Sequence, residues 1–188
     1  MTTIILFGGN GYIGRELTQQ WLARDPAAQF YILSRSGQNT LQAARVHNIA
    51  VPVDDFAAVN QVIPAQIDYI VDLVGRPVKD PAQLSAINQQ PATVMQQVAE
   101  THQAKAMGMI GGRLGPKAFV TMKSTIIQQL QSSSVRLAVV EPTLVYGGDR
   151  QDSLAKLIPL FKLLGHFNAK LKPITVTEVA QNLLTQLI

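Results

Sequence analysis

The segment that most constrains the fold is a run of glycines at three-residue spacing near the start of the chain. Gly8, Gly11 and Gly14 follow the apolar residues 4–7 and precede a segment whose apolar residues recur at helical spacing. A buried strand, a glycine turn and a helix start in this order are typical of a parallel α/β sheet that holds a pyrophosphate group. The free N–H groups at the helix N-terminus face such an anion. The sequence therefore predicts a dinucleotide site at this loop.

Each glycine of the loop has an expected role. Gly8 permits the tight turn, Gly11 lets the backbone approach the pyrophosphate, and Gly14 lets the helix pack closely on its strand. A glycine-rich turn that binds no ligand is the alternative. The loop residues predicted to contact the dinucleotide are Gly8, Asn10, Gly11, Tyr12, Ile13 and Gly14.

The rest of the chain alternates short β-branched runs with longer segments of helical periodicity, which is typical of a parallel sheet covered on both faces. The predicted strands are Thr3–Phe7, Phe30–Ser34, Ile49–Val53, Tyr69–Val74, Ala106–Ile110 and Arg136–Val140. The predicted helices are Tyr12–Ala23, Gln38–His47, Asp55–Val62, Pro81–Gln103, Pro116–Ser132, Ser153–Leu164 and Thr177–Leu187. We therefore expect an α/β, doubly wound Rossmann fold with a mostly parallel sheet of six or seven strands, in one domain over residues 1–188.

Composition excludes several kinds of site. The chain has 188 residues, 47% of them hydrophobic, which is enough for one substantial core but not for a second large domain. It has no cysteine, which removes disulfides, thiolate metal sites and cysteine nucleophiles. His47, His102 and His166 stand alone, without a second ligand at metal-binding spacing, so we expect no metal site.

Charge and hydropathy limit the classes of partner that the protein is expected to bind. The formal net charge of +4 suits an anionic ligand, but the sixteen Lys and Arg are scattered, which is not typical of a nucleic-acid-binding surface. No apolar run is long enough to span a bilayer, and the first residues lack the pattern of a signal peptide. We therefore expect a cytoplasmic protein that contacts neither membrane nor nucleic acid.

The end of the second predicted strand indicates which dinucleotide is preferred. An acidic residue there would accept hydrogen bonds from the ribose 2′-hydroxyl of NAD, but this chain has Ser34, Arg35 and Ser36. A guanidinium flanked by two hydroxyls suits the 2′-phosphate of NADP. We therefore predict NADP in preference to NAD, with the alternative that Arg35 is only a solvated loop residue.

These motifs, together with landmarks further along the chain, resemble the short-chain dehydrogenase/reductase superfamily in its extended and atypical branches, which include epimerase-like and NmrA-like proteins. The glycine spacing is the one that these branches use. Residues 141–147 read Glu-Pro-Thr-Leu-Val-Tyr-Gly, similar to the superfamily's Arg-Pro-x-x-Val-Tyr-Gly with Glu141 in place of arginine, and residues 173–180 are similar to its late strand and helix start. The resemblance covers the whole chain, although the usual C-terminal substrate region is shortened to about residues 147–172.

The resemblance implies further contacts to the dinucleotide. Asp54 would hydrogen-bond the adenine, and Leu73, Val74 and Gly75 would line the adenosine and ribose. The residues that the resemblance adds to the predicted site are Asp54, Asp55, Leu73, Val74, Gly75, Lys123, Pro142 and Thr143. The alternative for the two aspartates is that they only begin a helix.

Catalytic members of the superfamily reduce carbonyls with a Ser, Tyr and Lys set, in which the Tyr and Lys lie one helical turn apart. In this chain Phe119 occupies the tyrosine position, and glycines 111 and 112 stand where a serine is usual. The resemblance leaves two catalytic-site residues, Lys123 for the ribose hydroxyls and Asn88 to order a water or the backbone near that lysine. The alternatives are a surface lysine and a polar helix residue.

The function that follows is binding of NADP(H) without tyrosine-dependent acid catalysis. One hypothesis is a redox-sensing or partner-binding protein, similar to the NmrA-like branch. The alternative is an NADPH-dependent reductase of a small acceptor, such as a quinone or flavin, that needs no proton from the protein. A sugar epimerase or dehydratase is least expected because the C-terminal region is short, and a homodimer is expected only by analogy.

Overall fold

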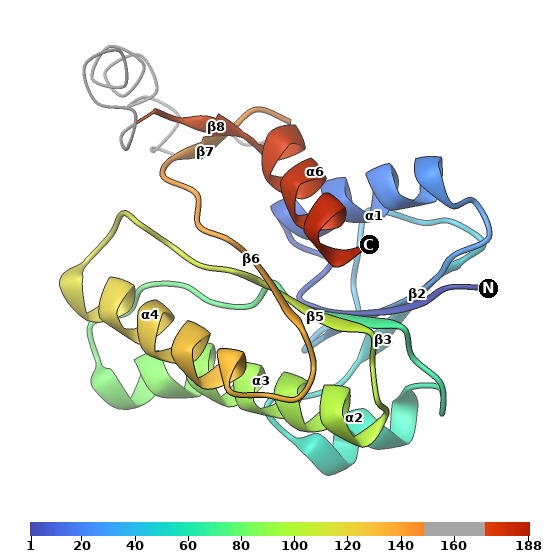
Figure 1. Ribbon diagram of the computed structural model, residues 1–188, viewed down its shortest axis with the longest axis horizontal. Helices are drawn as coiled ribbons and strands as arrows, with labels where there is room; N and C mark the ends of the chain where they lie inside the picture. The colour runs from blue at the N-terminus through green and yellow to red at the C-terminus, as the bar shows by residue number, and fades with distance from the viewer. Residues whose placement is uncertain (149–171) are drawn as a thin grey trace.

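The computed structural model describes residues 1–148 and 172–188, and its centre is a sheet with helices on both faces (Figure 1). The strands of this sheet are β1 (Thr3–Phe7), β2 (Gln29–Ser34), β3 (Val46–Ala50), β4 (Tyr69–Asp72), β5 (Ala106–Ile110) and β6 (Leu137–Val140). They lie in the order β3-β2-β1-β4-β5-β6, and every neighbouring pair is parallel. This confirms the predicted α/β class and the parallel sheet.

Helices cover the two faces of the sheet in two groups. On one face lie α1 (Tyr12–Arg24) and α6 (Val176–Leu187), which pack on each other. On the other lie α2 (Phe56–Val62), α3 (Pro81–Thr101) and α4 (Lys117–Gln131). Beyond β6, the short strands β7 (Val145–Tyr146) and β8 (Ile174–Thr175) form a second, two-stranded parallel sheet that leads into α6.

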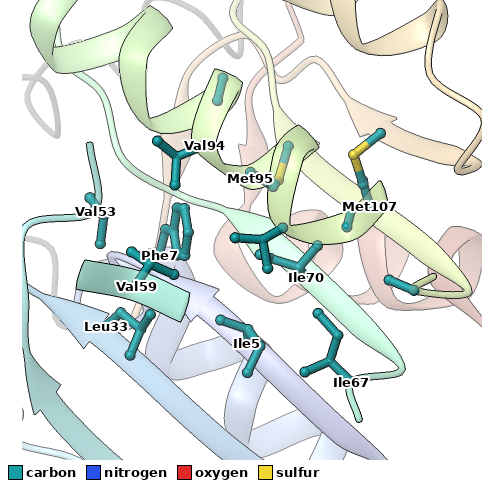
Figure 2. Close-up of a cluster of buried hydrophobic side chains, with 14 of the residues drawn as sticks. Ile5, Phe7, Leu33, Val53, Val59, Ile67, Ile70, Val94, Met95 and Met107 are labelled. Atoms are coloured by element: carbon teal, nitrogen blue, oxygen red, sulfur yellow. The ribbon is translucent and has the colours of Figure 1, made fainter. Parts of the chain in front are cut away.

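The alternation of side chains along the strands divides the core into two layers. In β1, Ile5 and Phe7 belong to the layer under α2, α3 and α4, whereas Ile4 and Leu6 belong to the layer under α1 and α6; all four are fully buried. Figure 2 shows the first layer, in which Ile5, Phe7, Leu33 and Ile70 of the strands meet residues of the overlying helices. Burial on both faces explains why β1 is apolar throughout.

The connection between β2 and β3 differs from the prediction. Residues 38–45, expected to belong to a helix over Gln38–His47, form turns and irregular backbone, and β3 begins at Val46. Asn39 accepts a hydrogen bond from the Leu41 N–H at 3.0 Å and donates one to Asn48 at 2.8 Å. Asparagine side chains compete with helical hydrogen bonds in this way, so the apolar spacing of this segment misled the prediction.

The third strand was predicted three residues too late, at Ile49–Val53. Val51 and Val53 are buried, but they lie beyond the ladder, which ends at Ala50. Pro52 between them lacks an N–H for a sheet hydrogen bond. The Val51 N–H donates one more hydrogen bond, to the Ser34 carbonyl at 2.9 Å, so burial just past the ladder gave the two valines the pattern of a strand.

Helix α6 begins one residue before its predicted start. Thr175, not Thr177, is its N-cap: the Thr175 hydroxyl accepts from the Glu178 N–H at 3.1 Å, and the Glu178 carboxylate accepts from the Thr175 N–H at 2.9 Å. This is the reciprocal pair known as a capping box.

Three predictions fall outside the described residues. They concern the helix over Ser153–Leu164, His166 and most of the proposed substrate region.

Candidate functional site

A cavity of about 730 Å³ opens at the carboxyl ends of the parallel strands, beside the glycine loop. The chain runs from β1 outward to β3 and then returns to β4 on the other side of β1, so the connections diverge at this point. Ligands of open α/β sheets bind in such a crevice. The residues that line it are Gly8, Asn10, Ser34, Arg35, Ser36, Val53, Asp54, Val74, Gly75, Arg76, Ala86, Ile87 and Pro91.

The glycine loop is held by close backbone contacts. Gly8 has a φ of +68°, in the left-handed region that favours glycine, and its N–H donates to the Leu33 carbonyl at 2.8 Å. A Cβ on Gly14 would lie 2.4 Å from the Gly9 oxygen and 2.5 Å from the Gly9 Cα. Helix α1 therefore packs on the loop itself at Gly14, whereas the sequence predicted packing on the strand.

Gly11 differs from the other two glycines because neither its backbone nor its immediate neighbours demand glycine. Its φ is −76°, and a Cβ there would meet only the Gly8 oxygen, at 3.2 Å. Gly11 is also the N-cap of α1, where no side chain caps the helix and no acidic residue lies in the first turn. The missing side chain leaves room on the outer side of the loop for a close ligand.

The end of β2 brings Ser34, Arg35 and Ser36 to the cavity. The Ser34 hydroxyl accepts from the Gly37 N–H at 3.1 Å, and the Ser36 hydroxyl accepts from the Gln38 N–H at 3.2 Å. The guanidinium of Arg35 is exposed and has no hydrogen bond or ion pair within the described residues. It is therefore free to bind an anion.

Arg76 is a cavity residue that the sequence reasoning missed. It follows Gly75 after β4, so it lies across the glycine loop from Arg35 in the sheet order, and its guanidinium also has no partner within the described residues. The signal was present in the sequence, because a basic residue just past a buried strand lies at the same sheet edge as the other strand ends.

Asp54 and Asp55 have different surroundings. Asp54 is exposed and lines the cavity, in agreement with a contact to a bound adenosine. Asp55 is the N-cap of α2, where its carboxylate accepts from the Ala58 N–H at 3.0 Å. For Asp55 the structure therefore supports the alternative of a helix start.

A buried polar cluster lies behind Gly75 and consists of Asp72, Asn88 and Lys123. Their exposed fractions are 1%, 0% and 4%. A Cβ on Gly75 would lie 2.5 Å from the Asn88 Oδ1 and 2.9 Å from the Lys123 Nζ, so both side chains press against this one glycine. Lys123 is therefore not a surface lysine, and Asn88 is not a solvated helix residue.

Hydrogen bonds tie this cluster to the backbone around Gly75. The Asp72 Oδ1 accepts from the Val74 N–H at 2.8 Å, and the Lys123 Nζ donates to the Val74 carbonyl at 3.4 Å. The Asn88 amide donates to the Arg76 carbonyl at 3.1 Å and the Leu84 carbonyl at 2.9 Å. Burial raises the pKa of Asp72 to about 6, opposed by Lys123, and burial lowers the pKa of Lys123, opposed by Asp72.

Phe119 lies between Lys123 and the end of β5. The Lys123 Nζ is 5.9 Å from the centre of the Phe119 ring, and a Cβ on Gly112 would lie 3.3 Å from that ring. The Lys123 ammonium, the Phe119 ring and Gly112 therefore adjoin one another.

Not every predicted contact reaches the cavity wall. Thr143 donates to the Lys172 carbonyl and Pro142 is buried, so both serve the connection from β6 to β7. The predicted residues outside the lining are Gly11, Tyr12, Ile13, Gly14, Asp55, Leu73, Lys123, Pro142 and Thr143.

Residues 1–148 and 172–188 contain no group of three His, Asp or Glu residues placed to hold a metal. Among the helices described, none is both long and apolar enough to cross a membrane.

Comparison with known proteins supports a nicotinamide-dinucleotide fold. The model of the NAD-dependent epimerase/dehydratase family matches residues 4–127. No curated protein matches the chain by sequence. Among solved structures, the Bordetella bronchiseptica enzyme WbmH in complex with NAD⁺ superimposes with a TM-score of 0.77 at 16% identity, over 100% of this chain and 72% of WbmH.

Two further structures have the same fold. A UDP-glucose 4-epimerase superimposes with a TM-score of 0.77 at 15% identity, over 99% of this chain and 72% of the epimerase. ElxO with NADP bound superimposes with a TM-score of 0.74 at 16% identity, over 100% of this chain and 91% of ElxO.

Proposed function

Because the chain belongs to the NAD-dependent epimerase/dehydratase family, we propose that it binds NADP(H) in the cavity beside the glycine loop. The observation that carries the proposal is the cavity itself, which joins the loop, an unpaired arginine and two serines at the carboxyl edge of the sheet. Structural neighbours determined with NAD⁺ and with NADP support a dinucleotide of this class. The residues fit the group at the loop, because a Cβ on Gly11 would have only the Gly8 oxygen within 4 Å, and its absence leaves room for a close ligand.

The preference for NADP rests on the end of β2. Arg35 offers a charged, bidentate donor to a 2′-phosphate, and Ser34 and Ser36 flank it, while no carboxylate stands there for the 2′-hydroxyl of NAD. Asp54, on the wall contributed by the segment after β3, would hydrogen-bond the adenine. The glycine loop would hold the pyrophosphate.

The chemistry of the bound cofactor depends on a proton source. NADPH supplies a hydride when bound, and carbonyl reduction also needs an acid at the oxygen. Phe119 cannot donate a proton, and Gly112 offers no hydroxyl. We therefore favour a redox-sensing or partner-binding role.

A second candidate function is a reductase of quinones, flavins or similar acceptors that need no acid from the protein. The presence of Lys123 and Asn88 beside Gly75 favours this candidate.

Titration of NADPH and NADH against wild type, Arg35→Ala and Arg45→Ala tests the cofactor assignment. Wild type should bind NADPH more tightly, and Arg35→Ala should weaken NADPH by about tenfold to a hundredfold because a charged hydrogen bond is worth about 1.5 to 3 kcal/mol. Wild type and Arg35→Ala should bind NADH with similar affinity. Arg45, an exposed arginine on the same β2–β3 connection but outside the cavity, is the matched control. Equal affinities for the two dinucleotides in wild type would contradict the assignment.

A further inference from the structure

Two arginines flank the glycine loop, one on each side. On the side of β2, the Gly8 N–H donates to the Leu33 carbonyl at 2.8 Å. On the side of β4, a Cβ on Gly8 would lie 2.9 Å from the Val74 Cγ2. Arg35 follows Leu33 by two residues, Arg76 follows Val74 by two residues, and both arginines line the cavity. The loop therefore lies between two cations.

The Arg76 guanidinium is not used by the fold of the described residues. It is exposed, and it has no hydrogen bond or ion pair there. Among the lining residues that the structure describes, Asp54 is the one carboxylate, and it follows β3, which lies beyond β2 in the sheet order. An unpaired cation at the wall of a cavity is available to an anionic ligand.

The backbone that carries the Arg76 side chain is held in place. Asn88, which is fully buried on α3, donates from its amide to the Arg76 carbonyl at 3.1 Å. Pro77 follows Arg76, and the residue before a proline is restricted towards extended backbone. A backbone fixed in advance lowers the entropy that is lost when the side chain binds a ligand.

The sheet order separates the tasks that the two arginines can perform. Strands β2 and β4 lie on opposite sides of β1, and neighbouring strands are about 5 Å apart, so the two strand ends are about 10 Å apart. A 2′-phosphate beside Arg35 is then on the far side of the glycine loop from Arg76. The pyrophosphate, held over the loop, is the phosphate group that adjoins Arg76.

We propose that Arg76 is a binding residue for the pyrophosphate, and that it contributes equally to the affinity for dinucleotides with and without a 2′-phosphate. The proposal rests on the proposed function, because the ligand is the dinucleotide of the same cavity. The guanidinium suits this task, since it binds two phosphate oxygens through paired, charged hydrogen bonds. Arg35 then selects the dinucleotide, whereas Arg76 adds affinity without selecting.

The test is calorimetric titration of wild type and Arg76→Met with NADPH and with three probes that lack parts of it. NADH lacks the 2′-phosphate, 2′-phospho-ADP-ribose lacks the nicotinamide, and adenosine 2′-monophosphate lacks the pyrophosphate. Arg76→Met should weaken NADPH, NADH and 2′-phospho-ADP-ribose by the same factor, about tenfold or more, the value of a charged hydrogen bond. The affinity for adenosine 2′-monophosphate should not change. Because Arg76 is exposed and unpaired, the variant loses no contact of the described fold.

Two further variants separate a specific contact from a general effect of charge. Lys79→Met is the matched control, because Lys79 is exposed on the same connection from β4 to α3 but lies outside the cavity lining. Its affinities for all four ligands should stay near the wild-type values. Arg76→Lys keeps the charge without the paired donors, so it should recover part of the affinity that Arg76→Met loses.

Three results would overturn the proposal and leave dinucleotide binding intact. Weaker binding of NADPH with unchanged binding of NADH would assign Arg76 to the 2′-phosphate. Weaker binding of adenosine 2′-monophosphate would assign it to the adenosine. Unchanged binding of every ligand would mean that Arg76 stays in solvent. Absence of NADPH and NADH binding by wild type would overturn the proposed function as well.

Discussion

Gly11 and Gly14 lie three residues apart in one loop, yet their missing side chains serve different purposes. A Cβ on Gly14 would lie 2.4 to 2.6 Å from the Gly9 backbone, which cannot move aside cheaply, whereas a Cβ on Gly11 meets only the Gly8 oxygen at 3.2 Å. The first glycine is needed for the fold of the loop. The second is available for contact with a ligand.

Alanine at the two positions should separate these purposes. We expect Gly14→Ala to lower the free energy of unfolding by about 1 to 3 kcal/mol, since the loop must shift to accept the methyl group. The free energy of unfolding of Gly11→Ala should lie within about 1 kcal/mol of the wild-type value, because the backbone at this residue is extended. The variant should nevertheless bind NADPH about tenfold more weakly. Urea denaturation and cofactor titration of the two variants provide the measurement. Unchanged binding by Gly11→Ala would mean that the pyrophosphate does not approach this glycine.

The elements that the sequence predicted well are those whose signals are local. The strands β1 and β5 have the predicted bounds. Helices α1 and α3 begin at their predicted residues and end within two residues of prediction, and α4 is one residue shorter at each end. The connection after β2 was mispredicted because Asn39 pairs with Asn48, nine residues away, a contact that periodicity does not encode.

The same distinction between local signals and contacts of distant residues applies to the candidate site. The glycine loop and residues 34–36 could be placed from their spacing after buried strands. The burial of Lys123 could not, because it depends on α4 packing beside α3 and bringing the ammonium to the Gly75 loop after β4.

The ends of β5 and α4 together determine what chemistry the site supports. We expect wild type to reduce simple ketones and aldehydes negligibly with NADPH, since Phe119 has no proton to give. Phe119→Tyr should gain partial activity, and Phe119→Tyr with Gly112→Ser should gain more, because a Cβ at Gly112 would lie 3.3 Å from the ring, so that the serine lies beside the phenol.

Steady-state NADPH oxidation with a ketone panel and a quinone panel distinguishes the two candidate functions. Quinone reduction that is present in wild type and insensitive to Phe119→Tyr supports the reductase. Activity with neither panel supports the sensing role. Vigorous ketone reduction by wild type would show that another residue supplies the proton and would end the non-catalytic interpretation.

At the scale of the whole molecule, the buried Asp72 carboxylate makes the stability of the fold depend on pH. Because burial raises the pKa of Asp72 to about 6 from an ordinary value of 3.8, this group stabilises the fold fully below pH 3.8, and the contribution is lost as the pH rises through 6. Asp68, Glu100 and Glu178 have lowered pKa values, so their contributions are present above their ordinary values of 3.8 to 4.5 and are lost in more acidic solution. Among the carboxylates of the described residues whose pKa is shifted, Asp72 is the one that titrates between pH 5 and 7.

The free energy of unfolding of wild type should accordingly fall from pH 5 to pH 7 by about 1 kcal/mol, because about one unit of the pKa shift lies within this range. Asp72→Asn should show a flat profile in this range, and Asp68→Asn should keep the wild-type slope there. Urea denaturation at half-unit pH intervals measures all three. A wild-type stability profile as flat as that of Asp72→Asn would show that Asp72 titrates at its ordinary pKa.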